Sequence, residues 1–216
     1  MRLSIYDGIK LLGSASLMQN VTGSSAIKGA PIDTLGMTDA ALRVCVAVPG
    51  GTSAPTAASL VFGLEESADG VTFSAALDNT STQIGFTLAP LIGATGNTAS
   101  GSNTILVMSS VAGITVGSIV TGTGLPTGGL VVTAVGTASV TLSGNATSAQ
   151  TGTTLSFTTD GEARIEGLGL NRKRYLRASV TPTYTGGTAP ACAVVAEIVQ
   201  GGPPQQLPAN TNVSNT

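Results

Sequence analysis

Histidine is absent from this chain of 216 residues, and so is tryptophan. The lack of histidine excludes Ser-His-Asp and Cys-His catalysis, histidine general bases and histidine-ligated metals in their usual forms. Three tyrosines and four phenylalanines are the only aromatic residues, which argues against the sugar-stacking cleft of a polysaccharide hydrolase. Acid–base chemistry by lysine or by carboxylates is what remains. We therefore expect a protein that is not an enzyme and that needs no cofactor or metal.

Charge is scarce as well. Charged residues make up 9% of the chain, against about 25% in an average globular protein. The net charge is −2 and the pI is near 4.9, so the basic excess of a nucleic-acid-binding protein is missing. A run of about 18 apolar residues, which a membrane span needs, does not occur. The first residues place Arg2 and Lys10 in a polar mixture, without the apolar core of a signal peptide. We expect synthesis in a cytoplasm, with no nucleic acid and no membrane as partner.

Cysteine occurs only twice, at Cys45 and Cys192, each within an apolar, strand-like run. In a reducing compartment two buried free thiols are favoured over a disulfide. A disulfide stays open at this point, because the two strands could be neighbours in the fold.

Glycine, threonine, serine, alanine and valine dominate the composition, with turn residues at a spacing of roughly 8–12 positions. No segment has a sustained helical period. Alternation of apolar and polar residues predicts strands, with a turn at Ser67–Gly70 between two of them. The predicted strands of the two chain halves cover residues 42–48, 60–65, 71–73, 163–168, 175–183 and 191–199. Pro182 and Pro190 suggest a sheet edge, because proline cannot donate to a ladder. The sequence predicts an all-β fold.

The distribution of charge divides the chain. Every charged residue lies before residue 79 or after residue 159, which indicates a module inserted into a host domain. We predict a discontinuous host from residues 1–90 and 159–200, an inserted β module at 91–158, and an extended C-terminal arm at 201–216. The module would be a small barrel or sandwich of five or six strands. Its apolar runs cover residues 104–108, 114–116, 118–120, 130–135, 139–142 and 153–157.

Acidic residues gather in two places. Glu65, Glu66 and Asp69 lie around a turn, where calcium could bind through oxygen ligands, but a solvated turn is the favoured interpretation. Asp160, Glu162 and Glu166 lie on a predicted strand and fit a solvent-facing edge better than a glycosidase carboxylate pair. The glycine-rich run at residues 122–128 precedes neither a Lys-Ser/Thr pair nor a helix, so it predicts a strand connection rather than a phosphate site.

Four basic residues form the one basic cluster, at the start of the strand predicted from residue 175: Arg172, Lys173, Arg174 and Arg177. One hypothesis is electrostatic contact with an acidic partner surface. The other is an ordinary solvated strand entry, and the sequence leaves both open. Nucleic-acid binding is disfavoured, because Tyr175 is the only adjacent aromatic residue.

Several motifs, in their order and spacing, carry a family resemblance. They are residues 42–48, Gly50-Gly51-Thr52, residues 64–73, and Lys173-Arg174-Tyr175-Leu176-Arg177 continuing to Val195. In these motifs the host halves resemble the jelly-roll capsid cement (decoration) proteins of tailed bacteriophages. The insert, with Gly122-Thr123-Gly124-Leu125-Pro126 and Val140-Thr141-Leu142-Ser143, resembles a β module found in phage structural proteins and bacterial surface proteins. Compact cement proteins lack this insert.

The resemblance implies a jelly-roll-like β-sandwich with an inserted small β-barrel or sandwich module. It also implies a structural virion protein on the outer capsid surface that stabilises the shell by bridging subunits. Its partners would be the major capsid protein and itself, as a homo-dimer or homo-trimer, with the insert projecting outward. We expect partner contacts on both terminal arms and on the basic cluster, at Arg2, Tyr6, Arg172, Lys173, Arg174, Arg177, Pro203, Pro204 and Leu207.

We consider two other functions as alternatives. A receptor-binding or tail-fibre component, or a bacterial adhesin, fits the insert equally well, but triple-stranded repeats, aromatic sugar platforms and a secretion signal are missing from the sequence. An enzyme such as a polysaccharide hydrolase would need a carboxylate pair in an aromatic cleft.

Overall fold

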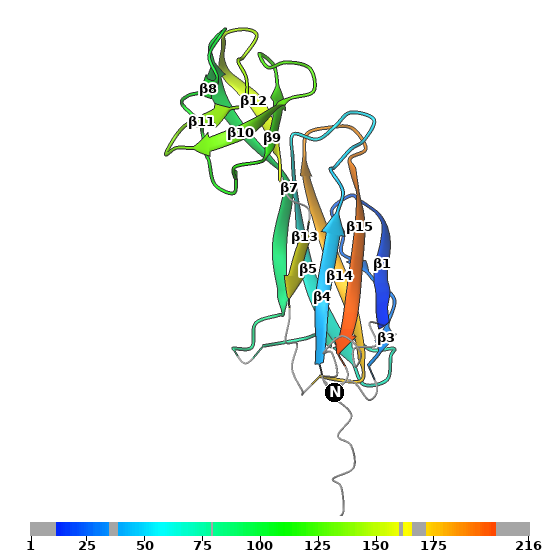
Figure 1. Cartoon of the computed structure of the whole chain (residues 1–216). Coiled ribbons are helices and arrows are strands. Elements are labelled where there is room, and N and C mark those ends of the chain that lie inside the picture. The colour runs from blue at the N-terminus through cyan, green and yellow to red at the C-terminus, as the bar shows by residue number, and fades with distance from the viewer. Residues whose placement is uncertain (1–11, 35–38, 79, 160–161, 166–171, 202–216) are drawn as a thin grey trace, which may run out of the picture.

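The computed structural model describes residues 12–34, 39–78, 80–159, 162–165 and 172–201, and these ranges contain fifteen strands and no helix (Figure 1). The predicted all-β class is confirmed. The strands are β1 (Leu12–Thr22), β2 (Ile27–Lys28), β3 (Ile32–Asp33), β4 (Asp39–Val46), β5 (Ala57–Ser67), β6 (Ser74–Ala75), β7 (Gly85–Thr98), β8 (Thr104–Ile105), β9 (Ile119–Gly122), β10 (Leu130–Val135), β11 (Val140–Leu142), β12 (Gln150–Thr158), β13 (Glu162–Ile165), β14 (Tyr175–Thr185) and β15 (Ala191–Gly201).

The host strands form two antiparallel sheets. One has the order β1-β15-β4-β13, and the other has the order β2-β14-β5-β7, with β3 also pairing with β14. When β2 and β3 count as one position and the two-residue strand β6, which pairs with the end of β5, is left out, the host strands in chain order run 1-8-3-6 in the first sheet and 2-7-4-5 in the second. This is the strand order of a jelly roll, so the predicted jelly-roll-like sandwich is confirmed.

Alternation along the strands builds the core between the two sheets. On β5 the buried apolar side chains are Ala58, Leu60, Phe62 and Leu64, and on β15 they are Cys192, Val194, Ala196 and Ile198. These are the faces that the sequence predicts for both strands. The ring of Phe62 stacks on that of Phe86 from β7, with 5.3 Å between the ring centroids. The sandwich therefore has one continuous apolar interior.

A return strand predicted over residues 71–73 is wrong. The turn at Ser67–Gly70 forms, with Gly70 at a φ of +75°. Oδ1 of Asp69 then accepts hydrogen bonds from the amides of Val71 (2.9 Å) and Thr72 (2.8 Å). These amides are committed to the turn, so pairing with β5 resumes only at β6.

Two other host predictions differ in extent from the structure. The strand predicted over residues 163–168 is β13, which begins one residue earlier, and residues 166–168 lie outside the described residues. β14 pairs with β2 at Ser179 and Val180. Pro182 lies beyond these two pairs, on the part of β14 that is paired with β5. This is the edge position that the proline predicts.

The inserted module grows from β7. The first half of this strand pairs with β5, and its second half pairs with β12, with Leu91 opposite both Ala58 and Thr158. The module strands run β7-β12-β9-β10-β11-β8. A single bridge between Asn97 and Leu106 links the far end back to β7. The sheet curls around its own core, but it is not a closed barrel, so the barrel alternative is wrong.

Most of the predicted module strands form, but the one over residues 114–116 is wrong. Gly113 and Gly117, on either side of it, have φ values of +77° and +98°. The amides of Ile114 and Ser118 donate back to Val111 and Thr115, at 3.2 and 3.1 Å. This pattern makes two turns rather than a strand. In Figure 1 the module lies at one end of the sandwich.

Replacing Phe62 with alanine tests the host core. The ring is 1% exposed, so its loss should lower the free energy of unfolding by about 3–5 kcal/mol. The matched control is Val61→Ala, because the adjacent Val61 side chain points out of the same strand and is 50% exposed. Chemical denaturation of both variants measures the difference. Equal small effects would contradict the assigned faces of β5.

Candidate functional site

The end of the sandwich opposite the module holds the predicted basic cluster. There β14 begins and β5 ends, with Tyr175 opposite Ser67 and Arg177 opposite Glu65. We call this region the charged end. It comprises Lys28, Asp33, Glu65, Glu66, Asp69, Asp78, Arg172, Lys173, Arg174 and Arg177.

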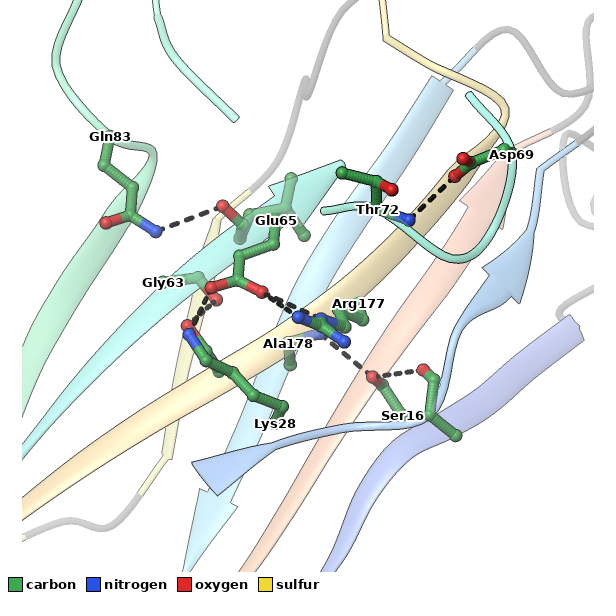
Figure 2. Close-up of polar contacts among 12 residues, drawn as sticks. Ser16, Lys28, Gly63, Glu65, Asp69, Thr72, Gln83, Arg177 and Ala178 are labelled. Carbon is green, nitrogen blue, oxygen red and sulfur yellow. Dashed lines mark hydrogen bonds and ion pairs between the residues drawn. The ribbon is translucent and has the colours of Figure 1, made fainter. Parts of the chain in front are cut away.

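Glu65 is the centre of the outward face of the charged end. Its carboxylate contacts Nζ of Lys28 from β2, and its Oε2 accepts a hydrogen bond from Nε of Arg177 at 2.8 Å (Figure 2). The Arg177 guanidinium also lies 4.0 Å from the centroid of the Phe73 ring. Burial raises the pKa of Glu65, but the hydrogen bonds and charges of Lys28 and Arg177 outweigh burial and hold this pKa below its usual value. Glu65 is therefore ionised at neutral pH.

Glu66 occupies the inward side of the same strand end. Its Oε2 lies 3.6 Å from Nη1 of Arg172, and its Oε1 lies 3.7 Å from Nζ of Lys173. Arg172 also donates to the carbonyl of Leu77 at 2.7 Å, and Lys173 donates to Oγ of Ser74 at 2.9 Å. The two bases thus hold the loop after β5 against the start of β14.

Arg174 makes a bidentate contact with Asp33 of β3. Its Nε donates to Oδ1 at 3.0 Å, and its Nη2 donates to Oδ2 at 2.7 Å. The guanidinium also lies 5.0 Å from the centroid of the Tyr175 ring. Parallel hydrogen bonds of this kind are the favoured geometry between arginine and a carboxylate.

A buried serine joins the two sheets at this end. A bulge in β1 between Ala15 and Leu17 turns Ser16 inward. Its Oγ accepts a hydrogen bond from the amide of Ala178 at 2.9 Å and donates to the carbonyl of Ala30 at 2.9 Å (Figure 2). The contact fixes β1, on the first sheet, against β14 on the second.

The four predicted basic residues are thus brought together, and each one has a carboxylate of this chain beside it. Five basic and five acidic residues make up the charged end, so their formal charges sum to zero (5 − 5 = 0). Any partner contact there would depend on short-range hydrogen bonds rather than on a strong basic field. Lys173 and Arg174 have side chains that are 45% exposed, whereas those of Arg172 and Arg177 are only 20% and 22% exposed.

The acidic residues do not converge on a metal site. Glu65 and Glu66 bind bases on opposite sides of β5, while Asp69 binds its own turn. Hydrogen bonds from Ser67 and from the amides of Thr72 and Val71 hold the pKa of Asp69 well below its usual value. Within the described ranges no group of three or more histidine, cysteine, aspartate or glutamate side chains could hold a metal ion.

The remaining predicted contacts belong to the arms. Arg2, Tyr6, Pro203, Pro204 and Leu207 lie outside the described residues. The strands that lead to them are described: Leu12 of β1 pairs with Gln200 of β15, and Gly201 pairs with Asp39. Both chain ends therefore leave the sandwich together, at the charged end.

Sequence reasoning missed Lys28, Asp33 and Phe73. Each lies far along the chain from its partner, and Lys28 and Asp33 belong to two-residue strands that have no periodicity of their own. The pairing of Arg177 with Glu65 could have been found, because both residues alternate with the buried positions of long strands.

Both cysteines are free thiols. Cys192 faces the core and its Sγ lies 2.9 Å from the carbonyl oxygen of Ala47, to which it donates. Burial raises the pKa of this thiol to about 11, so it is protonated and unreactive at neutral pH. Cys45 lies on β4 next to the inward-facing Val44 and opposite Val195 of β15, and it is half-buried.

Comparison with protein-family models, with curated proteins and with solved structures finds no match to this chain. In the described part of the chain no helix is long and apolar enough to cross a membrane.

Substitution of Glu65 tests whether its two ion pairs, with Lys28 and Arg177, contribute more to stability than the exposed ion pair of Asp33 with Arg174. Glu65→Gln removes the charge that binds Lys28 and Arg177, and should lower the free energy of unfolding by about 1–3 kcal/mol. Asp33→Asn is the matched control. Its partner Arg174 and its own side chain are 45% and 41% exposed, so we expect a loss below about 1 kcal/mol. Thermal or denaturant unfolding measures both, and a larger loss in Asp33→Asn would contradict the assignment.

Proposed function

We propose that this protein is a capsid decoration protein that binds the outer surface of a tailed-phage head and stabilises the shell by bridging its subunits. The observation that carries the proposal is the bipolar layout of the molecule. Both chain ends leave the jelly roll beside the charged end, while the uncharged module lies at the opposite end (Figure 1). The points at which the arms join the sandwich, Leu12 and Gly201, and the charged side chains thus lie at one end.

The proposed contacts are the two terminal arms and the exposed half of the basic cluster. Lys173 donates to Ser74 and Arg174 donates to Asp33, and both side chains, which are 45% exposed, have further N–H donors. Arms that lie along neighbouring subunits add buried area, and several weak contacts on one shell gain from effective concentration. The function is therefore mechanical, with no chemical step.

Support also comes from the opposite end of the molecule. The loops at residues 22–26, 47–56 and 185–190 carry no charge, and neither does the whole module. A hydroxyl-rich surface without charged side chains has no charge-assisted hydrogen bonds to offer the shell, whereas the charged end has them. We therefore place this surface away from the shell contact.

Quantitative mass spectrometry of purified virions tests the proposal. A decoration role predicts a copy number close to that of the major capsid subunit, and it predicts that particles lacking this chain break at lower heat or osmotic stress. Adding back the purified protein should restore their resistance. A few copies per particle, or absence from the particle, would refute a role on the head.

A double variant, Lys173→Ala with Arg174→Ala, tests the contact surface. Because both side chains are half-exposed, the variant should stay folded, with only a small loss of stability. Its affinity for shells should fall by about tenfold or more, since charge-assisted hydrogen bonds to the partner are lost.

Lys28→Ala is the control for that variant. It removes a base of the same end that is bound to Glu65 and lies on β2, outside the predicted contact set. Sedimentation of protein with purified shells measures the affinities. An unchanged affinity in the double variant would remove these two residues from the contact.

A receptor-binding or adhesin role is the second candidate, and one observation favours it. The module exposes Leu106 and Val107, at 54% and 70%. Val107 has a φ of +53°, an unfavourable conformation for a β-branched residue. Two contacts hold this segment in place. Leu106 forms a β-bridge with Asn97, and the amide of Met108 donates a hydrogen bond to the carbonyl of Ala138. Low copy number in virions, together with cell binding that depends on the module, would favour this role over decoration.

A further inference from the structure

One edge of the first sheet is open. β1 pairs with β15 at ten residue positions on one side. On its other side no strand or bridge of the described chain pairs with it. The amide of Ala30 donates to the Ser16 carbonyl at 2.6 Å, so the edge is covered up to that point. The open stretch is Leu17–Thr22, and in Figure 1 β1 lies at the margin of the sandwich.

The other edges of the sandwich have the features that block pairing. β13 has four residues, of which two are charged, and β2 and β3 have two residues each and include Lys28 and Asp33. The edge formed by β7 is interrupted by Pro90. The carbonyl of this proline accepts a hydrogen bond from the amide of Thr159 at 3.1 Å. Short length, charge and proline are how proteins protect sheet edges.

β1 has none of these protections in its open stretch. Its eleven residues include no charge and no proline. Met18 is 73% exposed, the second most exposed large apolar side chain of the sandwich after Val71. Gln19 and Asn20 are exposed as well. An open edge of this kind accepts an extended, uncharged strand.

We propose that this strand is β1 of a second copy, paired antiparallel about a two-fold axis that passes midway between Gln19 of one copy and Gln19 of the other. Residues directly opposite each other in a sheet point to the same face. Gln19 opposite Gln19 satisfies this rule. It places the inward Leu17 opposite the second copy's Val21 and the outward Met18 opposite the second copy's Asn20. The Val21 carbonyl accepts a hydrogen bond from the hydroxyl of Tyr184 at 2.7 Å.

Self-pairing is favoured over a different partner because the strand is complementary to itself. No like charges meet, since β1 has none, and each outward pair joins an apolar and a polar side chain. A two-fold contact between identical strands closes on itself and consumes both open edges. The protected edges at β13 and β2 then prevent further growth, so the product is a dimer rather than a fibre.

The dimer has a consequence for bridging. Leu12 lies seven residues before Gln19, so the two sets of chain ends would be about 45 Å apart along the strand direction. The first sheets of both copies join into one continuous sheet of eight strands. Two shell-binding ends at this spacing reach two different subunits. The dimer does not need the shell in order to form, so an experiment on the dimer and an experiment on the proposed function can give independent results.

Analytical ultracentrifugation of the full chain tests the pairing. The wild-type protein should sediment with about twice the 21.2 kDa mass of one chain, over concentrations that bracket about 1 μM. The double variant Met18→Lys with Asn20→Lys puts like charges opposite each other at two places, and should raise the dissociation constant about tenfold or more.

The matched variant Met18→Glu with Asn20→Lys changes the same two positions and puts opposite charges across the axis. It should dimerise at least as well as the wild type and more weakly at high salt. Circular dichroism checks that both variants fold.

Three results would overturn the proposal. They are a wild-type monomer throughout the concentration range, a dimer that both double variants leave unchanged, and a monomer that dimerises only after removal of residues 1–11. The last result would assign the open edge to the chain's own N-terminal segment.

Discussion

The antiparallel pairing of β14 with β5 is the constraint on which the rest of the structure depends. It extends over eleven residues, from Tyr175 opposite Ser67 to Thr185 opposite Ala57. On the inner face it places Ala178 and Val180 opposite Leu64 and Phe62. On the outer face it places Arg177 opposite Glu65. A shift of one residue would exchange these faces, exposing the core and burying the ion pairs.

Much of this arrangement follows from the sequence. The periodicity of residues 60–65, 175–183 and 191–199 predicts the buried faces, because long strands with one solvent face alternate strictly. The absence of charge over residues 79–159 indicates the module, which forms its own apolar cluster. The jelly-roll connectivity came from a resemblance and agrees with the observed strand order.

What the sequence did not predict has physical causes. β1 was missed because its bulge at Ser16 interrupts the alternation. β7 was missed because one strand serves two cores, so its apolar residues change sides along its length. The partners of the basic cluster were missed because residues such as Asp33 and Arg174 are 141 positions apart and meet only through the sheet. The arm residues lie outside the described chain, so their part in binding stays a prediction.

The charged end and the module give the molecule two dissimilar poles. At one pole, ten charged residues neutralise each other and fix the loops beside both chain ends. At the other, neutral loops and the module expose hydroxyl groups and scattered apolar side chains. In our proposal the first pole binds a shell and the second does not, and β1 joins two molecules between these poles.

Hydrogen–deuterium exchange of the protein, free and bound to purified shells, tests this account most directly. The account predicts that slowed exchange on binding is concentrated in residues 67–78, residues 172–174 and the chain ends, with the module unchanged. Slowed exchange confined to the module, with the charged end unaffected, would contradict it.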